Sequence, residues 1–263
     1  MSAEIIKKYP TGKVKLLLKG ITPAMANTLR RCIMDHVPTM AIDEVEFIKN
    51  SSAIYDEMIA HRLGLLVLET DLKSYNIKEE CTCESAGCSK CSLVMTLKAK
   101  GPGIVYAEDI KSKDPKVIPT HPKTIITKLL KGQELEFQAT ATLGSGSTHI
   151  KYSPGLAWYE YVPTISVNNN HPDFDKFKNK YPPQVFKDGK IEKKLIEELD
   201  LADACEGINN DIVTITRDPE KIWFYLEPWG QLTHKEILVT ALDAFQTLLT
   251  RYEQAIDKAH ASN

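Results

Sequence analysis

The sequence predicts an α+β protein, in which strands and long helices follow one another along 263 residues. Two patterns carry this prediction. Apolar and polar residues alternate from Leu135 to Leu143, which is typical of a strand with one buried face. From Leu238 to Ile256, apolar residues recur every three or four positions, which is typical of a helix. A chain of this length can bury a sizeable core in about one to three domains.

Composition and charge argue against several classes of protein. The chain has 33 Lys and Arg against 35 Asp and Glu, so it lacks the basic surplus of a nucleic-acid-binding or polybasic membrane-surface protein. The polar start from Met1 to Lys15 lacks the apolar core of a secretory signal. The apolar run Leu65–Leu68 is far shorter than the roughly 20 residues of a membrane span. We expect a cytoplasmic protein whose cysteines are kept reduced.

The first predicted elements are a strand from Lys13 to Lys19, ended by Gly20, and a helix that begins after Thr22. Thr22 suits the N-cap of this helix, and Pro23 suits its first position, where a missing N–H costs nothing. Pro38 ends the helix.

A strand is expected next, from Met40 to Ile48. Ile42 and Val45 are out of phase for one face of a regular strand. A β-bulge near Asp43-Glu44 would bring both onto the same face.

Further elements follow from the same patterns. A short helix is expected from Ser51 to Gly64. Strands are expected at Ser92–Lys100, Ile104–Ala107, Leu156–Val162, Ile212–Arg217 and Ile222–Leu226. Between residues 168 and 211 the chain is rich in Lys, Asp and Glu and has a helical pattern at Ile191–Leu199, so we interpret this stretch as a solvated subdomain.

The last predicted helix has more apolar surface than one sheet can cover. Thr233 and Glu236 form the pattern of a capping box, in which each side chain bonds the other residue's backbone N–H. The apolar residues after it form a seven-residue repeat: Leu238, Leu242, Phe245, Leu249, Tyr252 and Ile256. A second apolar flank consists of Ile237, Ala241 and Leu248. Either the helix lies between its own domain and a partner chain, or it is fully internal.

Four of the six cysteines lie within eleven residues, as Cys81, Cys83, Cys88 and Cys91. Four thiolates can complete a tetrahedral shell around Zn²⁺, and Gly87 permits the tight turn between the ligand pairs. Such a closed shell is structural, because it leaves no open coordination position. An iron–sulfur cluster, two disulfides or unligated thiols remain alternatives.

The other two cysteines, Cys32 and Cys205, carry no functional signal of their own. Cys32 lies on an apolar helix stripe, as a small buried hydrophobe would. The sequence contains no phosphate-binding loop, dinucleotide motif, nucleophile elbow or H-E-x-x-H zinc motif, and we predict no catalytic residue.

Five motifs occur in a characteristic order. They are Asn27-Thr28-Leu29-Arg30-Arg31, then Val37-Pro38-Thr39-Met40-Ala41-Ile42 with Val45-Glu46, then Asp56-Glu57-Met58-Ile59-Ala60-His61-Arg62-Leu63-Gly64-Leu65, then His149-Ile150-Lys151-Tyr152-Ser153-Pro154-Gly155, and Glu227-Pro228-Trp229-Gly230. From about Lys13 to Ile256 the chain thereby resembles the alpha-type subunits of DNA-dependent RNA polymerase. It is most similar to the archaeal D subunits, counterparts of the third-largest subunit of eukaryotic RNA polymerase II and of the bacterial alpha N-terminal domain.

This resemblance implies a domain organisation. Residues 1–49 and 223–263 would form a discontinuous dimerisation domain. Residues 50–167 would be an inserted β-rich domain that carries the cysteine loop, and residues 168–222 a ferredoxin-like insertion.

The resemblance also implies partners. The chain would pair with the L subunit and, with the small N and P subunits, form the platform for the two large catalytic subunits. The nucleotidyl-transfer site would lie in those other chains, and no sequence-specific DNA contact or membrane is expected. The residues expected to bind partners are Leu29, Arg30, Arg31, Ile33, Leu238, Leu242, Phe245, Leu249, Tyr252 and Ile256.

One departure from the family concerns the insertion. Many relatives begin it with C-P-x-x-V-F and have a later run of cysteines. Here the first place reads Tyr181-Pro182-Pro183-Gln184-Val185-Phe186, and Leu199–Gly207 contains only Cys205. Because one thiolate cannot hold a cluster, we expect an insertion without iron and sulfur.

Two other functions are compatible with parts of the sequence. A freestanding zinc-binding protein or zinc enzyme would use the cysteine loop, although an enzyme needs an open metal position. A nucleic-acid-binding module would show affinity that falls steeply with salt, which the balanced charge disfavours.

Overall fold

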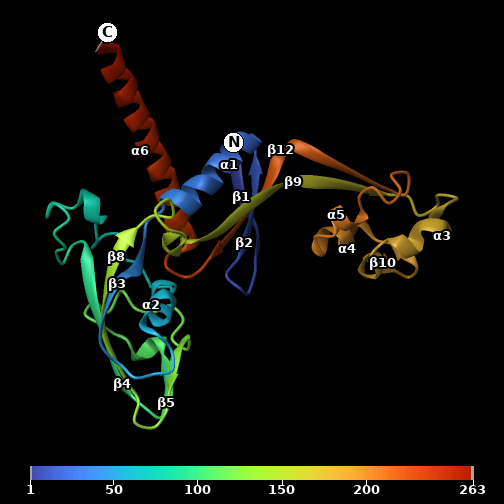
Figure 1. Ribbon diagram of the computed structural model, residues 1–263. Coiled ribbons are helices and arrows are strands. Elements are labelled where there is room, and N and C mark those ends of the chain that lie inside the picture. The colour runs from blue at the N-terminus through green and yellow to red at the C-terminus, as the bar shows by residue number, and fades with distance from the viewer. Residues whose placement is uncertain (1, 262–263) are drawn as a thin grey trace. The chain divides into compact units, whose positions relative to one another are not determined.

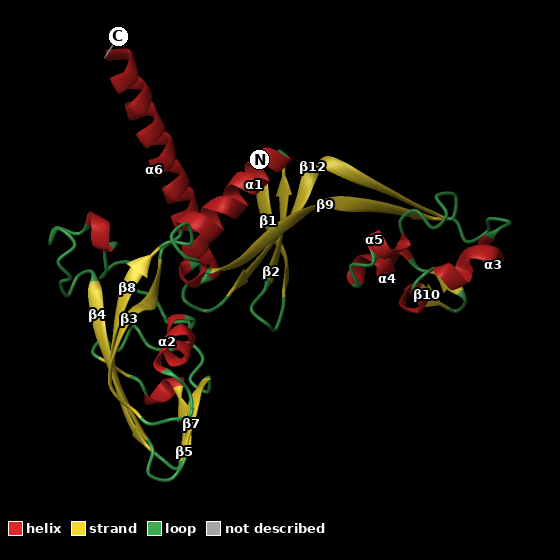
Figure 2. Ribbon diagram, viewed as in Figure 1, coloured by secondary structure: helices red, strands yellow, loops and turns green. Residues whose placement is uncertain are grey.

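The computed structural model describes residues 2–261, which form two compact units (Figures 1 and 2). The larger unit comprises residues 8–14, 27–158 and 225 onward. The smaller unit comprises the residues up to Lys7, residues 15–26 and residues 159–224. Each unit has an apolar core of its own.

The helices are α1 (Pro23–Arg31), α2 (Asp56–Gly64), α3 (Phe174–Phe177), α4 (Lys193–Glu198), α5 (Ala202–Cys205) and α6 (His234–Ala261). A π-helical segment, η1 (Cys32–His36), follows α1, and the 3₁₀ turns are η2 (Lys78–Glu80), η3 (Ala107–Asp109), η4 (Ile150–Tyr152), η5 (Lys178–Lys180) and η6 (Pro183–Val185). The strands are β1 (Ser2–Lys8), β2 (Val14–Lys19), β3 (Thr39–Asn50), β4 (Ser92–Lys100), β5 (Gly103–Tyr106), β6 (Lys111–Ser112), β7 (Ile125–Leu129), β8 (Glu134–Gly144), β9 (Gly155–Val167), β10 (Phe186–Lys187), β11 (Lys190–Ile191) and β12 (Val213–Pro228).

The sheet of the larger unit has the strand order β3-β8-β4-β6, with antiparallel neighbours. The alternation expected in β8 is confirmed, because its odd-numbered residues from Leu135 to Leu143 are all buried. They share one core with Ile59 and Leu63 of α2, which Figure 1 shows beside this sheet. A second antiparallel pair, β5 with β7, contributes Val105 and further residues to that core.

The bulge expected in β3 is confirmed. Pairing with β8 shifts register between Ile42 and Glu44, so that Ile42 and Val45 both lie opposite core residues of β8. Lys151 donates hydrogen bonds to the Ile42 carbonyl oxygen, at 3.1 Å, and to the displaced Asp43 carboxylate, at 2.8 Å. Burial opposes ionisation of Asp43, but these contacts with Lys151 keep the pKa of Asp43 below its ordinary value. A second shift beside Phe47 leaves Ile48 exposed.

Two predicted helix starts differ in outcome. The Thr22 cap is confirmed, since its hydroxyl accepts a hydrogen bond of 3.3 Å from the Met25 N–H. The helix expected from Ser51 begins only at Asp56. The Asn50 side chain accepts a hydrogen bond of 3.0 Å from the Ser52 N–H, and this local turn competes with the helix.

The capping box of α6 is also confirmed. The Thr233 hydroxyl accepts from the Glu236 N–H at 3.3 Å, and the Glu236 carboxylate accepts from the Thr233 N–H at 2.9 Å. Helix α6 packs against η1 within the same unit.

The smaller unit contains most of the sheet β1-β2-β12-β9 and the segment of residues 168–212. Strands expected at Ile212–Arg217 and Ile222–Leu226 are one strand, β12, which corrects the prediction. Its polar middle is exposed, yet the backbone stays paired, as the bond of 3.0 Å from the Gly20 N–H to the Glu220 carbonyl oxygen shows. The exposed strand β1 was not predicted, because a strand without a buried face has no alternation of apolar and polar residues.

Helices α3, α4 and α5 and the hairpin of β10 and β11 make up the segment of residues 168–212. This segment and the adjoining ends of β9 and β12 share a core of Ile165, Tyr181, Val185, Ile191, Ile196, Cys205, Ile212 and Val213. Among residues 2–261, the structure contains no helix with both the length and the apolar character needed to cross a membrane.

Candidate metal centre and partner surface

The four clustered cysteines converge in space. Their Sγ atoms all lie within 4.8 Å of one another. The Sγ atoms of Cys81 and Cys88, and those of Cys83 and Cys91, are 3.6 Å apart, and those of Cys88 and Cys91 are 3.9 Å apart. Zn–S bonds of about 2.3 Å in a tetrahedron place sulfurs about 3.8 Å apart. The four thiols can therefore hold a metal ion.

The same separations bear on the alternatives. A disulfide needs sulfurs about 2.05 Å apart, and all four cysteines are free thiols here. In a two- or four-iron cluster the four thiolates are distributed over more than one iron ion, which spreads some of them farther apart than the ligands of one ion. The compact geometry thus favours a single ion.

The loop conformation explains how eleven residues bring four thiols together. Glu84, Ser85 and Gly87 have positive φ values of 53°, 66° and 82°, which curl the chain between the ligand pairs. The N–H of Cys88 donates to the Cys91 sulfur at 3.3 Å, and that of Lys90 to the Cys88 sulfur at 3.4 Å. Such N–H···S bonds favour the thiolate that binds metal.

The thiols differ in their acidity. Desolvation raises the pKa of Cys91, which is fully buried, to about 12. Desolvation also opposes ionisation of Cys83, but hydrogen bonds from Cys81 and Cys91 lower its pKa to about 6. Metal binding at neutral pH would therefore release the proton of Cys91.

The predicted partner residues of α6 lie mainly at the surface. Leu242, Phe245, Leu249, Tyr252 and Ile256, which we call the outer stripe, are 37–68% exposed. Leu238, at the start of the repeat, is half-buried. The second flank faces inward, with Ile237 and Ala241 fully buried. Figure 2 shows the C-terminal part of α6 extending away from the sheet of the same unit.

The predicted residues near α1 have mixed positions. Ile33 is fully buried within the chain, whereas Leu29 is half-buried. Arg30 donates to Asn27 at 3.1 Å, and the exposed Arg31 lies 3.8 Å from Asp35. The exposed residues Met25 and Val239 were not among the predicted partner residues.

The cysteine of the insertion is distant from the metal-type loop in sequence and belongs to the smaller unit. Cys205 is fully buried, and burial raises the pKa of its thiol. It shares the apolar core with Tyr181.

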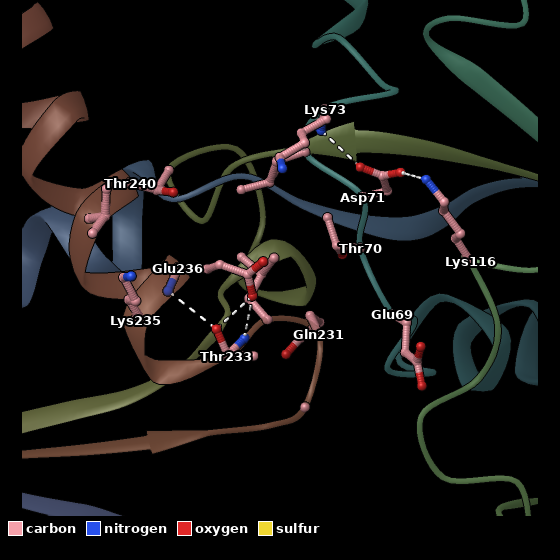
Figure 3. A pocket seen from close by; sticks show the side chains of 14 residues that line it. Glu69, Thr70, Asp71, Lys73, Lys116, Gln231, Thr233, Lys235, Glu236 and Thr240 are labelled. Atoms are coloured by element: carbon pink, nitrogen blue, oxygen red, sulfur yellow. Dashed lines mark hydrogen bonds and ion pairs between the residues drawn. The ribbon is translucent and has the colours of Figure 1, made fainter.

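One cleft of the larger unit has a volume of about 980 Å³ and is drawn in Figure 3. Two of its three carboxylates, those of Asp71 and Glu236, bond to groups of the chain itself. Asp71 accepts from Lys116 at 2.7 Å and from the Lys73 N–H at 3.0 Å, which holds its pKa well below the ordinary value. Glu236 caps α6. These bonds account for both groups structurally, and we assign no chemistry to the cleft.

Comparison with known proteins places the chain in a family. Residues 40–157 match the RNA polymerase Rpb3/RpoA insert domain. The chain is 34% identical to DNA-directed RNA polymerase subunit Rpo3 of Thermococcus kodakarensis, over 98% of the chain and 97% of that relative. It is 33% identical to the Archaeoglobus fulgidus subunit of the same name, over 94% of each. The Pyrococcus furiosus subunit is 41% identical over 63% of the chain and 61% of its own length.

The matched domain defines an alpha-type subunit of a multisubunit RNA polymerase. The chain belongs to the family of DNA-directed RNA polymerase subunit Rpo3, the archaeal D-type subunit. Membership in this family supports a role in transcription, as one part of a nucleotidyltransferase complex.

Proposed function

We propose that the chain is a non-catalytic assembly platform, which pairs with an L-type subunit and then receives the N and P subunits and the two large catalytic subunits. The observation that carries this proposal is the outer stripe of α6. Obligate interfaces resemble a domain core cut in half, and five large apolar residues at heptad spacing have that character. In this proposal residues 1–49 and 223–263 supply the dimerisation domain, 50–167 the β-rich insert, and 168–222 a further insertion.

The test is co-expression with an L-type subunit. The double variant L242D/F245D places two carboxylates in the proposed seam, and we expect at least a hundredfold weaker pairing, because buried unpaired charge is costly. The control T250D/Q254D adds the same charge on the far face of α6. Equal pairing of the two variants, or no pairing of the unaltered chain, would count against the proposal.

We propose further that the cysteine loop holds one structural zinc ion. All four thiols lie at separations suited to one tetrahedral ion, and no ligand position is left open for catalysis. Elemental analysis of the purified complex should give about one zinc per chain. Cys81→Ser should lose it, whereas Cys32→Ala, which changes a buried cysteine outside the loop, should retain it. Iron in place of zinc, or metal retained by the Cys81 variant, would contradict this assignment.

A further inference from the structure

Helix α6 has an inner row of residues at helical spacing, which we define as Ile237, Ala241, Ala244, Leu248 and Arg251. The first two are fully buried, and the next two are half-buried. From Leu249 to His260 every side chain is exposed. Packing against the chain's own unit therefore weakens along the helix. The exposed residues 249–260 form what we call the distal part of α6, and this part carries three outer-stripe residues, Leu249, Tyr252 and Ile256.

Arg251 continues the inner row and reaches the cysteine loop. Its guanidinium donates a hydrogen bond of 3.1 Å to the Glu80 carboxylate, across 171 positions of sequence. Glu80 ends the turn η2, and the next residue is the ligand Cys81. The Cys81 N–H donates to the Lys78 carbonyl oxygen at 3.3 Å, so the turn and the first thiol are held together.

We propose that Glu80 is a positioning residue, through which the closed cysteine loop sets the direction of the distal part of α6. This inference rests on the proposed pairing function. A metal ion that joins four thiols restricts the loop and with it the turn beside Cys81. The Glu80 carboxylate then holds Arg251 and limits the swing of the helix that presents Leu249, Tyr252 and Ile256. Metal loading and subunit pairing thereby become coupled, with no contact between the ion and the partner.

The expected effect is modest, because both side chains are mostly exposed, at 60% for Glu80 and 65% for Arg251. Exposed ion pairs contribute at most about 1 kcal/mol, which corresponds to about a fivefold change in an equilibrium constant. The test of the coupling is therefore whether the single and double variants weaken pairing non-additively, and not how large each change in affinity is.

The first experiment measures the dissociation constant of the complex with an L-type subunit. We expect E80Q and R251Q each to weaken pairing by about two- to fivefold, and the double variant to be no weaker than either. The differences should vanish in about 1 M salt, where screening acts over roughly 3 Å. E108Q, which removes the exposed partner of Lys123, is the matched control and should leave pairing unchanged. Additive effects of E80Q and R251Q would overturn the proposal.

The second experiment removes the metal with a chelator. Pairing of the unaltered chain should weaken by about two- to fivefold, and pairing of E80Q should change little, because the tie to α6 is already absent. Equal sensitivity of both chains to chelation would overturn the coupling.

Hydrogen exchange on the uncombined full chain tests the same tie without a partner. Amides of residues 249–260 should exchange faster in E80Q, whereas those of residues 237–248 should not change. Unchanged exchange in both segments would overturn the proposal, even if the chain pairs as proposed. If instead the unaltered chain fails to pair, the proposed function falls, while the exchange result still decides whether Glu80 holds the helix.

Discussion

The backbone of Gly146 lies directly against the carbonyl oxygen of Met34, so closely that a Cβ at Gly146 would overlap that oxygen. The neighbouring Ser147 N–H donates a hydrogen bond of 2.9 Å to the Asp35 carbonyl oxygen. These contacts join the turn after β8 to the π-helical segment η1, against which α6 packs. The absence of a side chain at residue 146 thus helps to place the helix that carries the outer stripe.

Gly146→Ala should therefore destabilise the larger unit by about 1–3 kcal/mol, the usual cost of forcing extra atoms into a packed site. The obstructing atom belongs to the backbone and cannot move aside by a rotamer change. The melting temperature of the purified complex measures the effect. Gly103→Ala is the control, because nothing lies within 4 Å of a Cβ there, and a similar loss in both variants would contradict this account.

The capping box of α6 gives a prediction with a pH dependence. Thr233→Ala should cost about 1 kcal/mol of stability, as expected for loss of an N-cap hydroxyl. Hydrogen bonds from the Thr233 hydroxyl and N–H lower the pKa of Glu236 below its ordinary 4.5. A carboxyl group with a lowered pKa stabilises the fold above that ordinary value, and the contribution is lost as the pH falls through the lowered pKa.

The difference in free energy of unfolding between the unaltered chain and Glu236→Gln should accordingly be constant near neutral pH. It should shrink toward zero in acid. Urea unfolding followed by circular dichroism at several pH values checks this. Thr250→Ala, which removes a hydroxyl from the middle of the same helix, should show neither the loss nor the pH dependence. A difference that increased in acid would contradict the claim that the ionised Glu236 carboxylate stabilises the fold.

In the smaller unit, the Lys15 ammonium lies 3.0 Å from the Asp200 carboxylate and 3.4 Å from the centroid of the Trp223 ring. The Lys15 side chain is 6% exposed, whereas that of Asp200 is 43% exposed. Removing the carboxylate therefore takes a charged partner from a buried ammonium, whereas removing the lysine leaves an acid that water can solvate.

Asp200→Asn should consequently destabilise the smaller unit by about 1 kcal/mol, and Lys15→Met should cost less. Hydrogen exchange of amides in α4 and α5 reports on this unit directly. Asp211→Asn, at an exposed acid of the same segment, is the control. The reverse order of the two effects would refute the asymmetry.

The core of the segment 168–212 is apolar around Cys205, and this also makes a prediction. Cys205→Ser should cost about 1–3 kcal/mol, because a hydroxyl enters a buried apolar site, and Cys205→Ala should cost less. Hydrogen exchange within α5 measures both effects. Chain produced without iron should give the same protection as chain produced with iron, and a loss of protection there would indicate that the segment depends on a cluster after all.

The sequence predicted those elements whose local pattern agrees with their tertiary surroundings. The alternation in β8, the bulge at Asp43 and both helix caps were predictable because adjacent residues determine them. Strand β1 and the middle of β12 were not, since they are exposed and held by backbone pairing alone. The cysteine spacing predicted the cluster, but the ion pair of Glu80 with Arg251 depends on the fold and leaves no trace in local sequence.

The displaced Asp43 has a consequence for how this region can change in evolution. Because Asp43 is one residue more than the facing strand has, its loss would leave Ile42 and Val45 two positions apart, which is the spacing of a regular strand. Val45 and Phe47 would still face the hydrophobic interior, and only the carboxylate that Lys151 contacts would be lost. Loss of Glu46 would instead make Val45 and Phe47 neighbours, which point to opposite sides of a strand. A deletion should thus be tolerated better at Asp43 than at Glu46, so the protein could lose the bulge in evolution more easily than the residues that follow it.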